Sequence, residues 1–127
     1  MSNLHKVEKI TSNTKKWIFS LCLAMAFPII AEAGQSTGLV SSIRVHNPNP
    51  TYGSSSGVVM FAAGSNSASP CAIKTEWAFS LSTETGKAMY DLLLSAAQNQ
   101  LPVTVVGSNL CSAWSDRESP YHISIQY

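Results

Sequence analysis

The N-terminal segment limits most strongly which residues of this chain are available to fold. Four lysines precede an apolar run from Trp17 to Ile30, and the run ends in Ala31-Glu32-Ala33. A basic segment, an apolar segment and a small-x-small pattern in this order are typical of a secretion signal. The run of about 14 residues is shorter than the roughly 20 that span a bilayer, and Pro28 interrupts it. We therefore expect residues 1–33 to be a signal peptide cleaved after Ala33, and residues 34–127 to form one domain.

Charge is distributed unevenly between this leader and the rest of the chain. The whole sequence has a formal net charge of +1, but residues 34–127 hold only four cations against five anions. The low charged fraction of 12% and the hydrophobic fraction of 45% exclude a disordered chain. A mature chain with so few cations offers little to a polyanion. We expect no nucleic acid partner, and no membrane insertion once the signal has been removed.

Cysteine usage fits export to the periplasm or the medium. Cys22 belongs to the leader, so Cys71 and Cys111 are the only two cysteines of the mature chain. In an oxidising compartment they are expected to bond to each other. Their 40-residue separation gives a stabilisation of about 4 kcal/mol in the chain-entropy description. Neither has the C-x-x-C spacing or the neighbouring histidine of a metal-binding or catalytic thiol.

Hydrophobic periodicity predicts five strands and one helix. Alternation predicts strands over 38–46, 71–81 and 121–127, and short apolar runs predict strands over 58–63 and 103–106. A helical spacing predicts an amphipathic helix near 86–98, with Thr85 as its N-cap. Turn-forming residues over 47–57 predict a long surface loop. The apolar helix positions are Met89, Leu92, Leu93 and Ala96, and the expected buried face of 71–81 holds Cys71, Ile73, Thr75, Trp77, Phe79 and Leu81.

The order of these elements is that of an OB-fold, a five-stranded barrel with a helix between its third and fourth strands. We therefore predict a mainly β protein with one helix and an OB-fold-like five-stranded barrel. The third and fifth strands of such a barrel are parallel neighbours, which would bring Cys71 and Cys111 to the same end, within bonding reach. An open α+β sheet with the helix on one face is the alternative.

The C-terminal half resembles a family of short secreted bacterial proteins of unassigned function. The resemblance covers residues 71–127 and rests on Gly86-Lys87-Ala88, Leu92-Leu93, the segment 102–107, Cys111, Trp114, Asp116, Glu118 and the closing strand. More distantly, the leader, the element order and the single disulfide are similar to the B subunits of AB-type bacterial toxins, including the subtilase-cytotoxin type. That resemblance implies an OB-fold and binding of cell-surface glycans.

The segment from Cys111 to Pro120 is the main candidate for a binding site. It places Trp114, Asp116, Arg117 and Glu118 in a loop anchored by the predicted disulfide. An aromatic ring can stack on the apolar face of a sugar while carboxylates and a guanidinium bind its hydroxyl groups. Tyr52, in the 47–57 loop, is a second candidate ligand-binding residue. The alternative is that Trp114 covers one end of the barrel while the charged residues form a solvated turn.

Other chemistry has weaker support in the sequence. Asp116 and Glu118 could form the carboxylate pair of a glycoside hydrolase, but so short a chain leaves little room for a cleft. His46 and His122 lack the spacing of metal ligands. We predict no catalytic residue, no metal and no cofactor. A base-stacking platform of Phe61, Trp77, Phe79 and Tyr121 is also disfavoured, because alternation places Trp77 and Phe79 on the same face as Ile73 and Leu81. We therefore expect these aromatic side chains to pack in the core.

These observations favour an exported, non-enzymatic binding module for a glycan or for an envelope or host protein. A small envelope hydrolase or an inhibitor of an envelope enzyme is the alternative.

Overall fold

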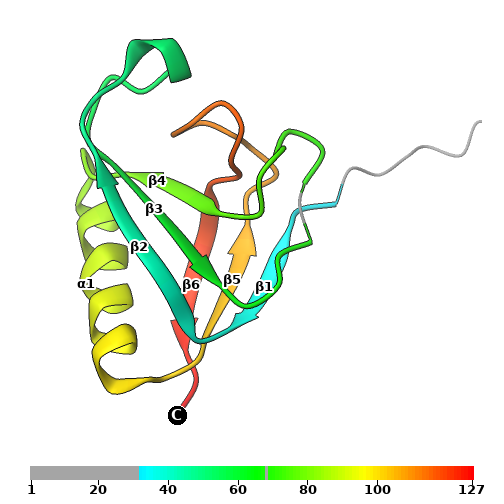
Figure 1. Ribbon diagram of the computed structural model, residues 1–127, viewed down its shortest axis with the longest axis vertical. Coiled ribbons are helices and arrows are strands. Elements are labelled where there is room, and N and C mark those ends of the chain that lie inside the picture. Colours follow the sequence, from blue (N-terminus) through cyan, green and yellow to red (C-terminus); the bar gives the residue numbers. More distant parts are fainter. Residues whose placement is uncertain (1–31, 68) are drawn as a thin grey trace, which may run out of the picture.

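The structure is a computed structural model that describes residues 32–67 and 69–127 (Figure 1). Almost all of the predicted signal peptide therefore lies outside the described residues. Within them the chain is mainly β with one α-helix and a short 3-10 helix. The elements in chain order are β1 (Gln35–Gly38), β2 (Val40–His46), η1 (Pro50–Tyr52), β3 (Val58–Ala63), β4 (Trp77–Ser80), α1 (Glu84–Asn99), β5 (Val103–Gly107) and β6 (Pro120–Ile125).

The strands form two antiparallel sheets of three strands each, in the orders β1-β5-β6 and β2-β3-β4. Only Leu39 separates β1 from β2, so one extended segment contributes its first part to one sheet and its second part to the other. Helix α1 packs against β6 and β2, and Figure 1 shows it along one side of the strands. The prediction of a mainly β chain with one helix is confirmed. No closed barrel is found over residues 32–67 and 69–127, so the five-stranded barrel is not confirmed.

The main core lies between the sheets and the helix. Alternation along β3 directs Val59 and Phe61 inward, and both are fully buried. The Phe61 and Phe79 rings meet edge to face, with centroids 5.9 Å apart. The buried Trp77 indole donates its Nε1 hydrogen to Ser36 Oγ over 2.9 Å, so its polar atom is satisfied. The predicted core position of Phe61, Trp77 and Phe79 is confirmed.

A second apolar cluster covers the opposite face of β3. Val58 and Met60 point to this face and are at most 2% exposed. They pack with Ala78 of β4 and with Ala113 and Trp114, which come from the segment after β5. The central strand of this sheet is therefore buried on both faces.

The predicted strand over 71–81 is wrong in its first half. Only Trp77–Ser80 is a strand, and Ile73, expected inside, is 82% exposed. The backbone amides of Ile73 and Lys74 both donate to the carbonyl of Asp116, over 3.0 and 3.2 Å. These hydrogen bonds and the disulfide at Cys71 hold this segment against a loop rather than in a sheet.

Smaller differences affect the other elements. Strand β1 was not predicted, and an irregularity between Val40 and Ser42 shifts the alternation, which leaves Leu39 54% exposed. The helix begins two residues earlier than predicted, because Thr83 rather than Thr85 caps it by accepting a 3.0 Å hydrogen bond from the Gly86 amide. Tyr121, expected on the inner face of the last strand, is 74% exposed.

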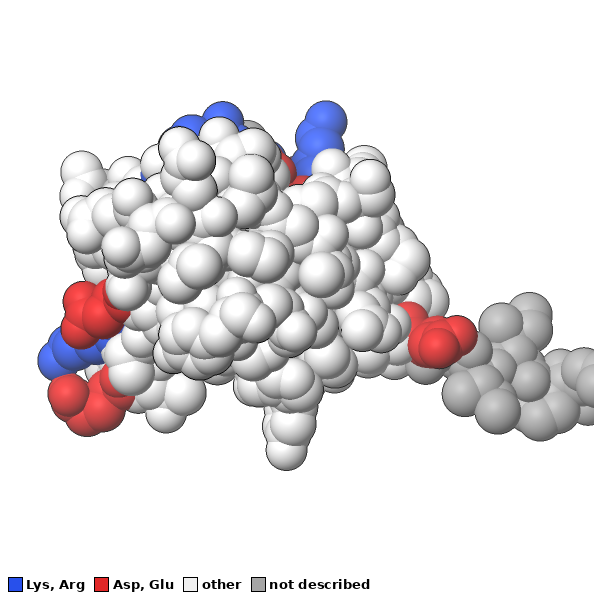
Figure 2. Space-filling view, turned by 90° about the horizontal axis from the view of Figure 1, so that it is seen from below, with Lys and Arg blue, Asp and Glu red and all other residues white. Residues whose placement is uncertain are grey.

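The surface carries few charges, as the composition predicts. The view from below in Figure 2 shows a face that is largely free of charged side chains, with acidic and basic groups near its margins. Over the residues that the structure describes, no helix has both the length and the apolar character needed to cross a membrane.

Candidate functional site

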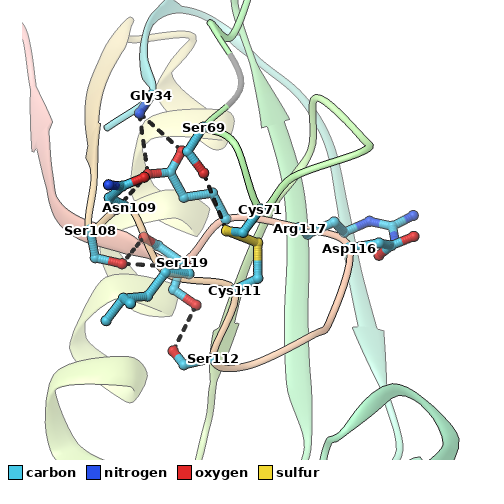
Figure 3. Close-up of a disulfide and its surroundings, with 12 residues drawn as sticks. Gly34, Ser69, Cys71, Ser108, Asn109, Cys111, Ser112, Asp116, Arg117 and Ser119 are labelled. Carbon is cyan, nitrogen blue, oxygen red and sulfur yellow. Dashed lines mark hydrogen bonds and ion pairs between the residues drawn. A yellow bond between two sulfur atoms is a disulfide. The ribbon is translucent and has the colours of Figure 1, made fainter. Parts of the chain in front are cut away.

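The segment Ser108–Ser119, here called the 108–119 loop, is fastened to the rest of the domain by a disulfide. Cys71 and Cys111 are bonded, with their Cα atoms 6.0 Å apart, which confirms the predicted pairing. Ser119 fixes the base of the loop: its amide donates to Leu110 over 2.7 Å and its carbonyl accepts from the Ser108 amide over 2.9 Å. Figure 3 shows these serines and the disulfide gathered at one place. The loop therefore has a defined shape without being a strand.

The tip of this loop docks against two other segments. The Ser115 amide donates to the carbonyl of Tyr52 over 3.2 Å, which joins the tip to η1. The carbonyl of Asp116 accepts from Ile73 and Lys74, which joins it to the segment before β4. Three parts of the chain that are distant in sequence thus meet on the outer face of β2-β3-β4.

Aromatic side chains are stacked where these segments meet. The rings of Tyr52 and Trp114 are nearly parallel, with centroids 4.7 Å apart and an interplanar angle of 12°. The His46 ring also lies near Trp114, with centroids 5.3 Å apart and an interplanar angle of 49°. Trp114 is only 5% exposed, whereas Tyr52 is 43% exposed. Tyr52 therefore offers the accessible ring face, whereas Trp114 is buried over the outer face of β3 and not at the end of a barrel.

Strand register explains why these groups share one face. In an antiparallel pair, directly opposite residues point to the same side. Arg44 lies opposite Met60, and His46 lies opposite Val58, so both β2 side chains point toward the apolar cluster beneath Trp114.

A network of ion pairs borders the aromatic stack. The Arg117 guanidinium, 14% exposed, places Nη2 3.0 Å and Nε 3.1 Å from Glu76 Oε2. Arg117 also pairs with Asp116, and Arg44 pairs with Glu76. Among the described residues Lys74 takes part in no ion pair, although it lines the same surface. The three cations here outnumber the two carboxylates.

The stack and four of these charged groups, all except Glu76, line a cavity of about 430 Å³. Of the five predicted ligand-binding residues it unites Tyr52, Trp114, Asp116 and Arg117. Sequence reasoning missed the contributions of β2 and of residue 74, because these depend on strand register and loop docking. The complete lining is Arg44, His46, Asn49, Tyr52, Met60, Lys74, Trp114, Asp116 and Arg117.

Glu118, the fifth predicted ligand-binding residue, lies apart from this cavity. Its side chain is 0% exposed and accepts hydrogen bonds from the amides of Gly34 and Asn109. Figure 3 shows Gly34 and Asn109 on one side of the disulfide and Asp116 with Arg117 on the other. Asp116 and Glu118 therefore do not face a common cleft, as a pair of glycosidase carboxylates would.

Metal binding has no geometric support over residues 32–67 and 69–127. No group of three or more histidine, cysteine or acidic side chains there is close enough to share an ion. His46 faces Trp114, while His122 is exposed on β6 beside Tyr121, with ring centroids 5.9 Å apart.

None of the protein-family models, curated proteins and solved structures compared with this chain matches it. The resemblances to short secreted bacterial proteins and to toxin B subunits therefore stay predictions.

Proposed function

We propose that this chain is an exported, non-enzymatic binding module that takes a carbohydrate at the Tyr52 cavity. The observation that carries the proposal is the ring of Tyr52, which is 43% exposed and supported from behind by Trp114 at 4.7 Å. A ring held in one orientation loses little conformational freedom when a ligand stacks on it.

The chemistry around the ring fits a sugar. The C–H face of a pyranose packs on an aromatic ring, and its hydroxyl groups need a few fixed donors and acceptors nearby. Asn49, Lys74 and Asp116 line the same cavity and supply amide, ammonium and carboxylate groups. A volume of about 430 Å³ suits one or two sugar rings.

Export is supported by the disulfide, since such bonds persist in oxidising compartments. The OB-like arrangement is supported by strand order. If β1 and β2 are counted as one strand, it pairs with β3 and with β5, as the first strand of an OB-fold pairs with the second and the fourth. The Ala78 amide of β4 donates to the carbonyl of Glu118, just before β6, over 3.0 Å, which brings the two sheets together at one end.

Protein binding, as by an inhibitor of an envelope enzyme, is the second candidate function. A cavity of about 340 Å³ lies between the start of α1 and the 108–119 loop. Leu110 and Tyr121 at this cavity are 61% and 74% exposed, and neither is needed for the Tyr52 site. Exposed apolar side chains beside a groove are typical of surfaces that contact another protein.

A glycan array probed with the exported protein tests the first proposal. We expect at least one carbohydrate to bind, and Tyr52→Ala to weaken that binding by about tenfold or more, as for truncated anchor residues. Tyr127→Ala, which removes a fully exposed tyrosine outside the cavity lining, is the matched control and should bind as the wild type does. Absence of any bound glycan, or unchanged binding by Tyr52→Ala, contradicts the proposal.

A further inference from the structure

Glu118 is a buried carboxylate whose partners are backbone amides. Its Oε1 and Oε2 lie 3.2 and 3.0 Å from the Gly34 nitrogen, and Oε1 lies 2.7 Å from the Asn109 nitrogen. None of the ion pairs among the described residues includes Glu118, and the neighbouring Arg117 is engaged by Glu76 and Asp116. Burying a carboxylate without a cation is costly, so a missing positive charge is expected close to it.

The surroundings of Gly34 contain more acceptors than its amide can serve. A Cβ on Gly34 would lie 2.4 Å from Glu118 Oε2, 2.4 Å from the Ser67 carbonyl oxygen and 2.9 Å from Asn66 Oδ1. Asn66 Oδ1 is itself buried and accepts no hydrogen bond from the residues that the structure describes. The one hydrogen of the Gly34 peptide nitrogen is already divided between the two oxygens of Glu118, whereas an ammonium group has three hydrogens to donate.

We propose that Glu118 and its neighbours form the binding site for the α-ammonium group of a chain that begins at Gly34. Hydrolysis of the Ala33–Gly34 peptide bond consumes one water molecule: the hydroxyl joins the Ala33 carbonyl carbon and a hydrogen joins the Gly34 nitrogen. The new amine takes up a proton from solvent, and the new Ala33 carboxyl group releases one. Removal of the leader thus creates the positive charge that the buried carboxylate lacks.

This proposal rests on the predicted cleavage after Ala33 and not on the ligand of the Tyr52 cavity. The sequence identified the cleavage position from the small-x-small pattern alone. The structure independently places the residue after that position against the buried carboxylate. The cleaved chain should therefore be more stable than a longer one.

Reactivity of the α-amine in the exported protein tests the proposal directly. N-terminal sequencing should give Gly34. In a brief reaction with an amine-acetylating reagent, the Gly34 amine should be modified at least about tenfold more slowly than Lys74 and Lys87, which are exposed. In urea this difference should disappear. A different first residue, or an α-amine as reactive as the lysines in the native state, overturns the proposal.

A comparison of two chain lengths separates ion pairing from simple burial. Glu118→Gln should raise the unfolding equilibrium constant about tenfold more in the chain that begins at Gly34 than in one that begins at Ala33. Asp91→Asn, at an exposed carboxylate on α1, is the control and should change the unfolding equilibrium constant equally in the two chains. An equal effect of Glu118→Gln in both lengths overturns the proposal. If Glu118→Gln fails to fold, the acetylation rate of the Gly34 amine in the wild-type chain tests the proposal by itself.

Discussion

Tyr52 and Trp114 stack on each other but differ in what they offer to a ligand. The accessible ring of Tyr52 lies on the outside, whereas Trp114 is held between Tyr52 and the apolar side chains of Val58 and Met60. The same separation applies to the acidic residues of the loop, because Asp116 lines the cavity and Glu118 is buried. At the scale of the residue, burial therefore decides which predicted side chains can reach a ligand.

Truncation of Trp114 tests its packing role. We expect Trp114→Ala to lower the free energy of unfolding by about 3–5 kcal/mol, because it leaves a cavity over the outer face of β3. Urea denaturation provides the measurement. Tyr52→Ala is the matched control and should lower the free energy of unfolding far less. A midpoint for Trp114→Ala equal to that of wild type would show that the ring does not cover this cluster.

Gly107 tests how closely the backbone approaches Glu118. A Cβ at this position would lie 2.1 Å from Glu118 Oε1, so Gly107→Ala should cost about 1–3 kcal/mol through overpacking. Gly57→Ala is the matched control, because its nearest neighbour would be 3.7 Å away, which is ordinary contact. Thermal denaturation of both variants gives the comparison. Equal stability of the two would contradict the position described for Glu118.

At the scale of the element, the sequence predicted what depends on local pattern and missed what depends on pairing. The apolar run of β3 and the helical spacing of α1 are local signals: β3 has its predicted bounds, and α1 contains the predicted helix and begins two residues earlier. The extended segment before β4 also alternates, but its amides find acceptors on the 108–119 loop. No local pattern predicts that the 108–119 loop supplies these acceptors. No local pattern predicts the strand register that places Arg44 and His46 in the cavity either.

The start of α1 allows a direct test of one such difference. Thr83→Ala should lower the free energy of unfolding by about 1 kcal/mol, because the Gly86 amide loses the hydroxyl that accepts its hydrogen. Thr85→Ala, at the cap position suggested by sequence, should change it by less than about 0.5 kcal/mol. Chemical denaturation of the two variants distinguishes the positions, and a larger effect at Thr85 would favour the sequence-based assignment.

At the scale of the whole molecule, the disulfide joins the segment before β4 to the loop that closes the outer face. Replacing both Cys71 and Cys111 by serine should cost about 2–5 kcal/mol, because the unfolded chain regains the freedom of a long loop. Guanidinium denaturation with and without dithiothreitol supplies the control: the reductant should destabilise the wild type and leave the double variant unchanged. If the reductant leaves the stability of the wild type unchanged, the disulfide contributes nothing to the free energy of unfolding.

Because β3 is buried on both faces, the chain is prone to aggregate before the disulfide forms. Val58–Ala63 contains six consecutive residues without a charge or a proline, a composition typical of segments that self-associate as cross-β aggregates. On one face of this strand Val58 and Met60 pack against Ala113 and Trp114 of the 108–119 loop. In a reducing compartment the disulfide that anchors this loop does not form. Newly made chains therefore expose the aggregation-prone strand β3. Synthesis without export should therefore yield insoluble protein. Oxidation of the one pair, Cys71 and Cys111, should be enough to convert an aggregating chain into a folded, soluble one.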